Sequence, residues 1–199
     1  MIPDIQIKEI RKALLESARP LIFFDDDPDG VCSFLQFYKV NPEAKGIIYK
    51  VAGSLDERFL KKVEEYSPDT IFILDVAMVS QDFLDKVSNV YWIDHHKPLD
   101  RKNVKYYNPM IESKGKDNRP ISYWAYKITK VSPWLAMVGC VGDWFLPKDI
   151  IKKVRELAVE TYQVLCCEGM GRVDCFVKSN GEVIVNEINT IPGFTKISM

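Results

Sequence analysis

Apolar runs of strand length alternate with segments of helical pattern over most of the chain. An i, i+3, i+7 stripe of Ile7, Ile10 and Leu14 predicts an amphipathic helix at about residues 5–18, ending before Pro20. The strand-like runs and the helix-like segments between them are, in order, 21–24, 31–40, 46–51, 54–66, 70–74, 80–87 and 90–93. This alternation predicts an α/β fold with a doubly wound, mainly parallel sheet and flanking helices.

Local signals refine the middle of the chain. Ser54 and Glu57 have the spacing of a capping box, which predicts that a helix begins there, and Ser80 opens the next helix. The polar region 101–116 is expected to be a loop, and residues 120–129 are expected to be helical.

A later apolar segment contains one acid. Ser132 followed by Pro133 marks a helix start, and because residues 134–144 are apolar almost all round, this helix is expected to be buried. Asp143 falls inside it, and an unpaired buried carboxylate is costly. Its partner is expected to be either a metal ion or an arginine or lysine.

The pattern changes after Pro147. Asn180-Gly181 between alternating apolar residues predicts an antiparallel β-hairpin, and Gly169 closes the long helix expected before it. The residues that mark one face of this helix are Ile150, Val154, Leu157, Thr161 and Leu165.

The composition narrows the class of protein. Apolar residues make up 47% of the 199 residues, enough for a core, and the net charge of −1 argues against a general nucleic-acid or membrane binder. The five cysteines have no CxxC spacing and are expected to be reduced core thiols. No signal peptide or membrane-spanning run is recognised, so a cytoplasmic location without a membrane partner is expected. The oligomeric state is left open.

Acidic groups follow three of the predicted strands. Asp25, Asp27 and Asp29 come after the first, Asp75 after the third, and Asp94-His95-His96 after the fourth. The carboxyl ends of parallel strands share one edge of the sheet, so these groups are expected to converge. Crowded carboxylates repel one another unless a cation lies between them. A divalent-metal site is therefore predicted; a solvated acidic turn with a helix cap is the alternative for the first cluster.

The only two histidines of the chain are adjacent, His95 and His96. Their place after an acid at a strand end favours a role in metal binding or acid–base chemistry over a structural one. Imidazole and carboxylate together suit Mn²⁺ or Mg²⁺ where oxygen ligands dominate, and Zn²⁺ where nitrogen ligands dominate.

The hairpin carries a second group of polar residues. With Asn180-Gly181 as the two loop residues, Asp174 lies opposite Glu187, Arg172 opposite Asn189, and Val177 opposite Ile184. Like charges directly opposite are unfavourable, which points to a cation between Asp174 and Glu187 or, alternatively, to a solvent-facing side with weak repulsion.

Four motifs in residues 15–150 resemble those of the DHH phosphoesterase superfamily, which includes RecJ-type nucleases, oligoribonucleases and pyrophosphatases. They are Asp25-Asp26-Asp27-Pro28-Asp29-Gly30, Leu74-Asp75-Val76, Asp94-His95-His96 and Gly139-Cys140-Val141-Gly142-Asp143.

The resemblance implies two divalent metals, usually Mn²⁺ and otherwise Mg²⁺, and hydrolysis of phosphodiester or phosphoanhydride bonds by metal-activated water. Asp75 would bridge the metals and act in catalysis, and His96 would orient or stabilise the phosphate. Asp25 occupies a position that binds metal in some branches only. The full ligand set it implies is Asp25, Asp27, Asp29, Asp75, His95 and Asp143. The substrate would be a phosphate compound such as an oligonucleotide, a cyclic dinucleotide or a short single-stranded nucleic acid.

Residues 147–199 resemble the C-terminal ATP-grasp segment of D-alanine–D-alanine ligase, through Arg172-Val173-Asp174 and the run Asn186 to Thr195. The resemblance implies that Asp174, Glu187 and Asn189 hold Mg²⁺ between ATP phosphates and that Arg172 contacts the phosphate. It assigns Gly193 and Ser198 to the D-alanine side. Mg²⁺ and ATP would bind only if this segment were complete.

The sequence therefore predicts a DHH-type domain at residues 1–147 and a truncated ligase segment at 148–199, together a chimera that is natural, designed or mis-assembled. A Mn- or Mg-dependent phosphoesterase is the expected function. A ligase fragment that is inactive alone, or a non-enzymatic chimeric fold, is the alternative.

Overall fold

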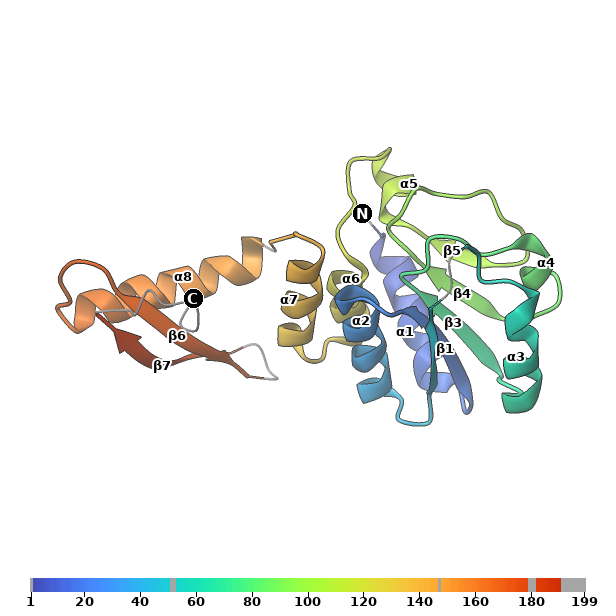
Figure 1. The fold of residues 1–199 in the computed structure, drawn as a ribbon, viewed down its shortest axis with the longest axis horizontal. Helices are drawn as coiled ribbons and strands as arrows, with labels where there is room; N and C mark the ends of the chain where they lie inside the picture. The colour runs from blue at the N-terminus through green and yellow to red at the C-terminus, as the bar shows by residue number, and fades with distance from the viewer. Residues whose placement is uncertain (1, 51–52, 147, 179–181, 191–199) are drawn as a thin grey trace.

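A five-stranded parallel sheet forms the centre of the molecule, with the strand order β2-β1-β3-β4-β5 (Figure 1). The computed structural model describes residues 2–50, 53–146, 148–178 and 182–190. The strands are β1 (Pro20–Asp25), β2 (Lys45–Tyr49), β3 (Thr70–Leu74), β4 (Val90–Ile93) and β5 (Lys105–Tyr107). The predicted α/β class and the predicted parallel sheet are confirmed.

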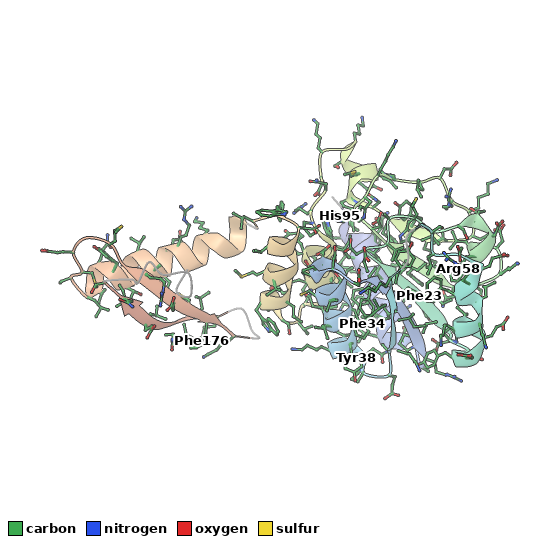
Figure 2. The ribbon with its side chains drawn as sticks, in the orientation of Figure 1. Phe23, Phe34, Tyr38, Arg58, His95 and Phe176 are labelled. Atoms are coloured by element: carbon green, nitrogen blue, oxygen red, sulfur yellow. The ribbon has the colours of Figure 1, made fainter. Side chains whose placement is uncertain are left out.

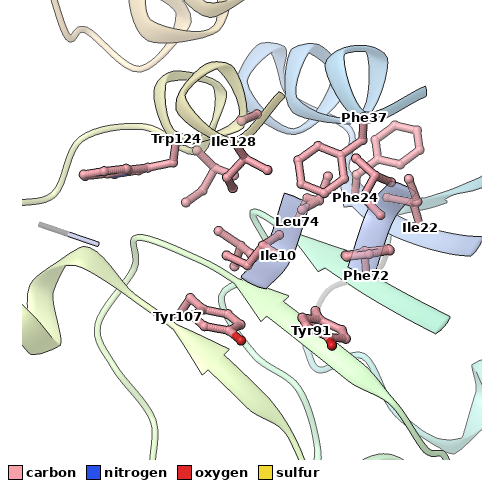
Figure 3. Close-up of a cluster of buried hydrophobic side chains, with 14 of the residues drawn as sticks. Ile10, Ile22, Phe24, Phe37, Phe72, Leu74, Tyr91, Tyr107, Trp124 and Ile128 are labelled. Carbon is pink, nitrogen blue, oxygen red and sulfur yellow. The ribbon is translucent and has the colours of Figure 1, made fainter. Parts of the chain in front are cut away.

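Helices cover both faces of this sheet, because successive strand residues point to opposite sides. Ile22 and Phe24 of β1 pack with the helices of one face, whereas Leu21 and Phe23 pack with those of the other. The first face is covered by α1 (Asp4–Glu16), α2 (Pro28–Val40), α6 (Ile121–Thr129) and α7 (Pro133–Gly142), and the second by η1 (Glu57–Phe59), α3 (Leu60–Tyr66) and α4 (Gln81–Leu84). Figure 3 shows the first cluster, in which Ile10 and Phe37 lie among the strand side chains. Helices on both faces are the doubly wound arrangement expected from the sequence.

The predicted capping box is wrong. Asp56, rather than Ser54, accepts the capping hydrogen bond, from the backbone N–H of Arg58, and it starts the 3₁₀ turn η1. Glu57 instead pairs with Lys86. Ser80 does cap its helix, by accepting from the N–H of Phe83, but this helix ends at Leu84, earlier than expected.

Two predictions for the segment after residue 100 also need correction. Residues 101–116 are not all loop, since they contain β5 and α5 (Pro109–Ser113), and Asn108 caps α5. The sequence pattern did not reveal β5, because this strand is only three residues long and lies at the edge of the sheet. Helix α7 is buried on one side only: Trp134, Val138 and Val141 are exposed.

The C-terminal unit consists of α8 (Lys148–Val164) and the antiparallel pair β6 (Arg172–Val177) and β7 (Val183–Asn189). Figure 1 shows the pair lying along α8 and apart from the five-stranded sheet, with α7 between them. This confirms the predicted long helix and hairpin, although α8 ends at Val164 and not at Gly169. The predicted turn residues, Asn180 and Gly181, lie outside the described residues. Three of the five cysteines, Cys166, Cys167 and Cys175, lie in this unit and are not buried, so the expectation of core thiols is wrong for them. It is confirmed for Cys32 and Cys140, which are buried.

The hairpin register is as expected at its open end and wrong near the turn. Asp174 faces Glu187 and Arg172 faces Asn189, but Val177 faces Val183 instead of Ile184. The pairing shifts by one residue between Asp174 and Cys175. An extra residue in β7 there forms a β-bulge, which a pattern of alternation cannot reveal.

Glycine at position 30 lets the start of α2 lie directly on the end of β1. A Cβ added there would lie 2.5 Å from the backbone oxygen and 2.8 Å from the backbone nitrogen of Asp25. Backbone atoms cannot give way as a flexible side chain can. We therefore expect Gly30→Ala to lower the free energy of unfolding by about 1–3 kcal/mol, measured by urea denaturation.

Gly171→Ala is the control for this substitution. The three atoms nearest to its added Cβ would all belong to side chains: two ring atoms of Tyr162, at 3.2 Å, and the end of the Ile188 side chain, at 3.7 Å. Equal losses of stability in the two variants would contradict the close approach of α2 to β1.

Candidate metal centre

The strand ends bring the predicted acids to one edge of the sheet. The adjacent strands β1, β3 and β4 are in register, with Phe24 beside Leu74 and Leu74 beside Ile93. Asp25 ends β1, and Asp75 and Asp94 are the next residues after β3 and β4. Parallel topology therefore places these acids side by side.

His95 lies at the centre of the candidate site. Its Nε2 atom is 3.2 Å from Asp143 Oδ2, 3.3 Å from Asp75 Oδ1 and 4.0 Å from Asp29 Oδ2. Its Nδ1 atom lies 2.9 Å from the carbonyl oxygen of Asn118. A carbonyl only accepts, so Nδ1 donates to it, and Nε2 is the ring nitrogen that faces the three carboxylates. This is the orientation that a metal-binding histidine needs.

Two carboxylates of the first motif are held by backbone N–H groups. The N–H groups of Ile121 and Ser122, at the start of α6, donate to the two oxygens of Asp29 at 2.6 and 2.8 Å. Asp29 is fully buried, and burial raises its pKa to about 6 despite these bonds. Asp27 caps α2 by accepting from the N–H of Gly30 at 2.8 Å.

Asp75 is the most strongly perturbed acid. It is 1% exposed, and its Oδ1 atom has no hydrogen-bond partner among the described residues. Burial first, and then the charges of Asp29 and Asp27, raise its pKa well above the ordinary value. Its backbone is also left-handed, with φ of 59°. A buried carboxylate oxygen without a donor fits a cation.

Two close-packed glycines allow Asp143 to reach the site from α7. A Cβ at Gly142 would lie 2.7 Å from Pro28 Cβ, and one at Gly139 would lie 2.4 Å from Ser122 Oγ. Asp143 caps the C-terminal end of α7 instead of lying inside the helix, and burial raises its pKa. In this structure its partner is His95, so neither a lysine nor an arginine is needed to explain it.

The ligand atoms form two overlapping groups, each within 4.8 Å. One group contains Asp75, His95 and His96, and the other contains Asp29, His95 and Asp143. Among the residues described by the structure, Asp25 and Asp27 belong to neither group. Asp25 is beside the site, and burial raises its pKa.

His96 is held differently from His95. Its Nδ1 atom lies 2.8 Å from Asp94 Oδ1, a hydrogen bond that raises the pKa of His96. The sequence motifs did not identify the residues that orient the two imidazoles, Asp94 and Asn118. Asp94 lies inside the third motif, which was a usable signal, whereas Asn118 acts through a backbone carbonyl and has no sequence signal.

The hairpin residues Arg172, Asp174 and Glu187 are neighbours, as expected. The guanidinium of Arg172 donates to Asp174 at 3.0 Å and lies 3.8 Å from Glu187 Oε1, and it lowers the pKa of Asp174. Asn189 pairs with Arg172 across the strands. Gly193 and Ser198 lie outside the described residues. Figure 2 shows Phe176 of this hairpin on the C-terminal unit and His95 in the part of the molecule that contains the five-stranded sheet.

Solved structures with a similar fold include two RecJ proteins and CDC45. RecJ from Thermus thermophilus in complex with Mn²⁺ has a TM-score of 0.53 and 16% identity, covering 69% of this chain and 24% of that protein. An exonuclease RecJ bound to manganese has a TM-score of 0.53 and 14% identity, covering 75% and 40%. CDC45 from Entamoeba histolytica has a TM-score of 0.53 and 15% identity, covering 87% and 43%. At these identities the similarity establishes the fold.

Residues 136–199 match the family described as D-ala D-ala ligase C-terminus. The ligase of Shouchella clausii is 54% identical over 54 residues, which are 27% of this chain and 15% of that enzyme. The ligase of Coxiella burnetii (strain Dugway 5J108-111) is 50% identical over 77 residues, which are 39% of this chain and 20% of that enzyme. The chain thus spans at most about a fifth of the length of these relatives.

The chain therefore joins a RecJ-like fold to a segment with the sequence of a D-alanine–D-alanine ligase C-terminus, as the motifs predicted. Within the described ranges, no helix is both long enough and apolar enough to cross a membrane.

Proposed function

We propose that this chain is a metal-dependent phosphoesterase, a hydrolase that cleaves phosphodiester or phosphoanhydride bonds. The observation that supports this most directly is the buried, unpartnered Oδ1 atom of Asp75 beside the Nε2 atom of His95. Such an arrangement is unfavourable in the folded chain alone and favourable around a divalent cation.

The residues that would hold the cations are those whose oxygen and imidazole donors meet in the two overlapping groups. His95 has one ring nitrogen free for a cation, so it would hold one ion together with Asp29 and Asp143. Asp75, beside His95, would help to hold this ion and a second one, for which the first motif supplies Asp25 and Asp27. The oxygen-rich donor set suits Mn²⁺ or Mg²⁺. A bound divalent ion would supply an acidified water and charge neutralisation at the phosphate.

The chain's own residues prepare the site for a phosphate group. The bond from Asn118 fixes His95, and the N–H groups of Ile121 and Ser122 fix Asp29, so neither must reorganise when a cation or substrate arrives. His96 is 44% exposed and is the imidazole available to contact the substrate. The RecJ and exonuclease names of the structural neighbours make short single-stranded nucleic acid a reasonable substrate class.

The test is cleavage of bis(p-nitrophenyl) phosphate and of a short single-stranded oligonucleotide by the chelated chain with Mn²⁺, Mg²⁺ or no metal added. We expect cleavage with Mn²⁺ and none without a divalent ion. Equal rates with and without metal would contradict the proposal, as would inactivity of a chain shown to bind Mn²⁺ towards every phosphate ester tested.

An ATP-dependent ligase activity is the second candidate, favoured by the sequence match and by the grouping of Arg172, Asp174 and Glu187. The internal guanidinium already neutralises Asp174, and the chain spans only a small share of the ligases that it matches. We propose that this unit does not catalyse ligation by itself. Formation of D-alanyl-D-alanine from D-alanine and ATP would contradict this.

A further inference from the structure

One short segment, residues 117–124, holds two of the candidate metal ligands by its backbone. The N–H groups of Ile121 and Ser122 donate to the carboxylate of Asp29 at 2.6 and 2.8 Å. Three residues before Ile121, the carbonyl oxygen of Asn118 lies 2.9 Å from Nδ1 of His95. The positions of Asp29 and His95 therefore depend on what holds this segment in place.

A two-pronged ion pair closes the turn at the start of the segment. Arg119 donates from Nε to Asp117 Oδ1 at 2.8 Å and from Nη2 to Asp117 Oδ2 at 2.6 Å. The backbone N–H of Asp117 donates to the hydroxyl of Ser113, at the end of α5, at 2.8 Å. Only 22% of the Arg119 side chain and 12% of the Asp117 side chain are exposed. Asn118 lies between these two residues, so the pair fixes its backbone.

The same guanidinium ties the turn to helix α6. Its Cζ atom lies 4.7 Å from the ring centre of Tyr123 and 4.6 Å from that of Trp124. Both aromatic side chains are buried, and Trp124 belongs to the core cluster of Figure 3. A guanidinium over an aromatic face is attracted to it, and more strongly where water is excluded. Arg119 thus links the turn before α6 to the first residues of the helix itself.

Helix α6 has no capping side chain of its own. The residue before it, Pro120, makes no side-chain hydrogen bond to its first turn, and Asp29 of α2 accepts from the N–H groups there instead. The place of this first turn therefore determines where the carboxylate of Asp29 lies. Groups that fix a metal ligand from outside strengthen metal binding, because the ligand is already oriented.

We propose that Arg119 is a positioning residue of the metal centre. By joining Asp117 to the aromatic rings of α6, it holds the backbone groups that orient Asp29 and His95. This inference rests on the proposed function for the presence of a divalent cation. The hold on the backbone follows from the contacts alone and can be measured without metal or substrate.

Arg119→Lys and Arg119→Gln test this proposal through the Kd for Mn²⁺, measured from the electron paramagnetic resonance signal of the free ion. Lysine keeps the charge but cannot form the two parallel bonds or lie flat on a ring, and glutamine loses the charge as well. We expect both variants to raise the Kd by about 10–100-fold. If only the charge of Arg119 mattered, lysine would leave the Kd unchanged and glutamine would lower it, because a positive charge repels the cation. That pattern would overturn the inference.

Arg11→Lys is the matched control. Arg11 is also a partly buried arginine bound to α6, but at the other end of the helix. Its Nη1 atom donates to the carbonyl oxygen of Ile128, at 2.8 Å, and to that of Thr129. We expect its substitution to lower stability and to leave the Kd for Mn²⁺ unchanged. A rise in Kd equal to that of Arg119→Lys would show that any loosening of α6 weakens the site, and the specific role of Arg119 would be excluded.

Amide hydrogen exchange in the chelated chain tests the same inference without a metal. We expect the N–H groups of Ile121 and Ser122 to exchange at least about 10-fold faster in Arg119→Lys than in the wild type, and at the wild-type rate in Arg11→Lys. Unchanged exchange of these two groups in Arg119→Lys would overturn the inference. A wild type that binds no Mn²⁺ would contradict the proposed function, whereas the exchange rates would still decide whether Arg119 holds the donors to Asp29.

Discussion

Asp75→Asn is expected to reduce Mn²⁺-dependent phosphodiester cleavage by at least about 1,000-fold. A bound cation contributes several kcal/mol to stabilising a phosphoryl transition state, and each 1.4 kcal/mol is tenfold in rate. Asp75 lies beside His95, and its buried Oδ1 atom accepts no hydrogen bond from the described residues. Binding a cation is therefore the role that its negative charge fits. The measurement is kcat/KM for bis(p-nitrophenyl) phosphate at saturating Mn²⁺.

Asp69→Asn is the matched control, because Asp69 and Asp75 lie at opposite ends of β3. Asp69 is satisfied by the chain itself: its carboxylate accepts from the hydroxyl of Ser17 and from the N–H groups of Ala18 and Arg19. Its loss should lower stability and leave kcat/KM of the folded fraction unchanged. If Asp75→Asn retained the activity of Asp69→Asn, a cation-binding role for Asp75 would be excluded.

The sequence predicted the sheet because its signals were local and repeated. The buried strands β3 and β4 were predicted with their observed bounds, since their apolar runs are short and end in turn residues. The edge strand β5 was missed because it is only three residues long and follows a polar stretch, so it shows no apolar run although Tyr107 is buried. The exposed side of α7 was missed as well, since an evenly apolar sequence has no polar face to mark the surface.

For the site, the sequence could predict which acids share an edge but not what holds them. Parallel topology alone implies that Asp75 and His95 meet. That the start of α6 supplies two N–H groups to Asp29 depends on tertiary packing over more than 90 residues of separation. The bond from the Asn118 carbonyl to His95 depends on backbone geometry that no side-chain pattern encodes.

The same buried acids should make the metal-free chain less stable as pH rises. Burial raises the pKa of Asp29 to about 6 and that of Asp75 well above its ordinary value. Between the ordinary carboxyl pKa near 4 and these raised values, the folded chain therefore binds more protons than the unfolded chain. The free energy of unfolding then falls as pH increases through this range.

In chelator at pH 7.5, we therefore expect Asp75→Asn to be more stable than the wild type, by about 1–3 kcal/mol, because the substitution removes a buried charge without a partner. Its stability should also fall less steeply between pH 5 and pH 7. Urea denaturation at several pH values measures both effects. A less stable variant with the wild-type slope would show that the carboxylate of Asp75 is satisfied within the chain.

Mn²⁺ should reverse this order. An ion that binds only the folded chain, at 100 times its Kd, adds about 2.7 kcal/mol to the free energy of unfolding. For a chain of this size that raises Tm by about 5–10 °C. We expect this rise in the wild type and in Asp69→Asn but not in Asp75→Asn, so the variant that is more stable in chelator becomes the less stable one in Mn²⁺. Equal rises in all three proteins would place the bound ion away from the edge of the sheet where Asp75, His95 and Asp143 meet.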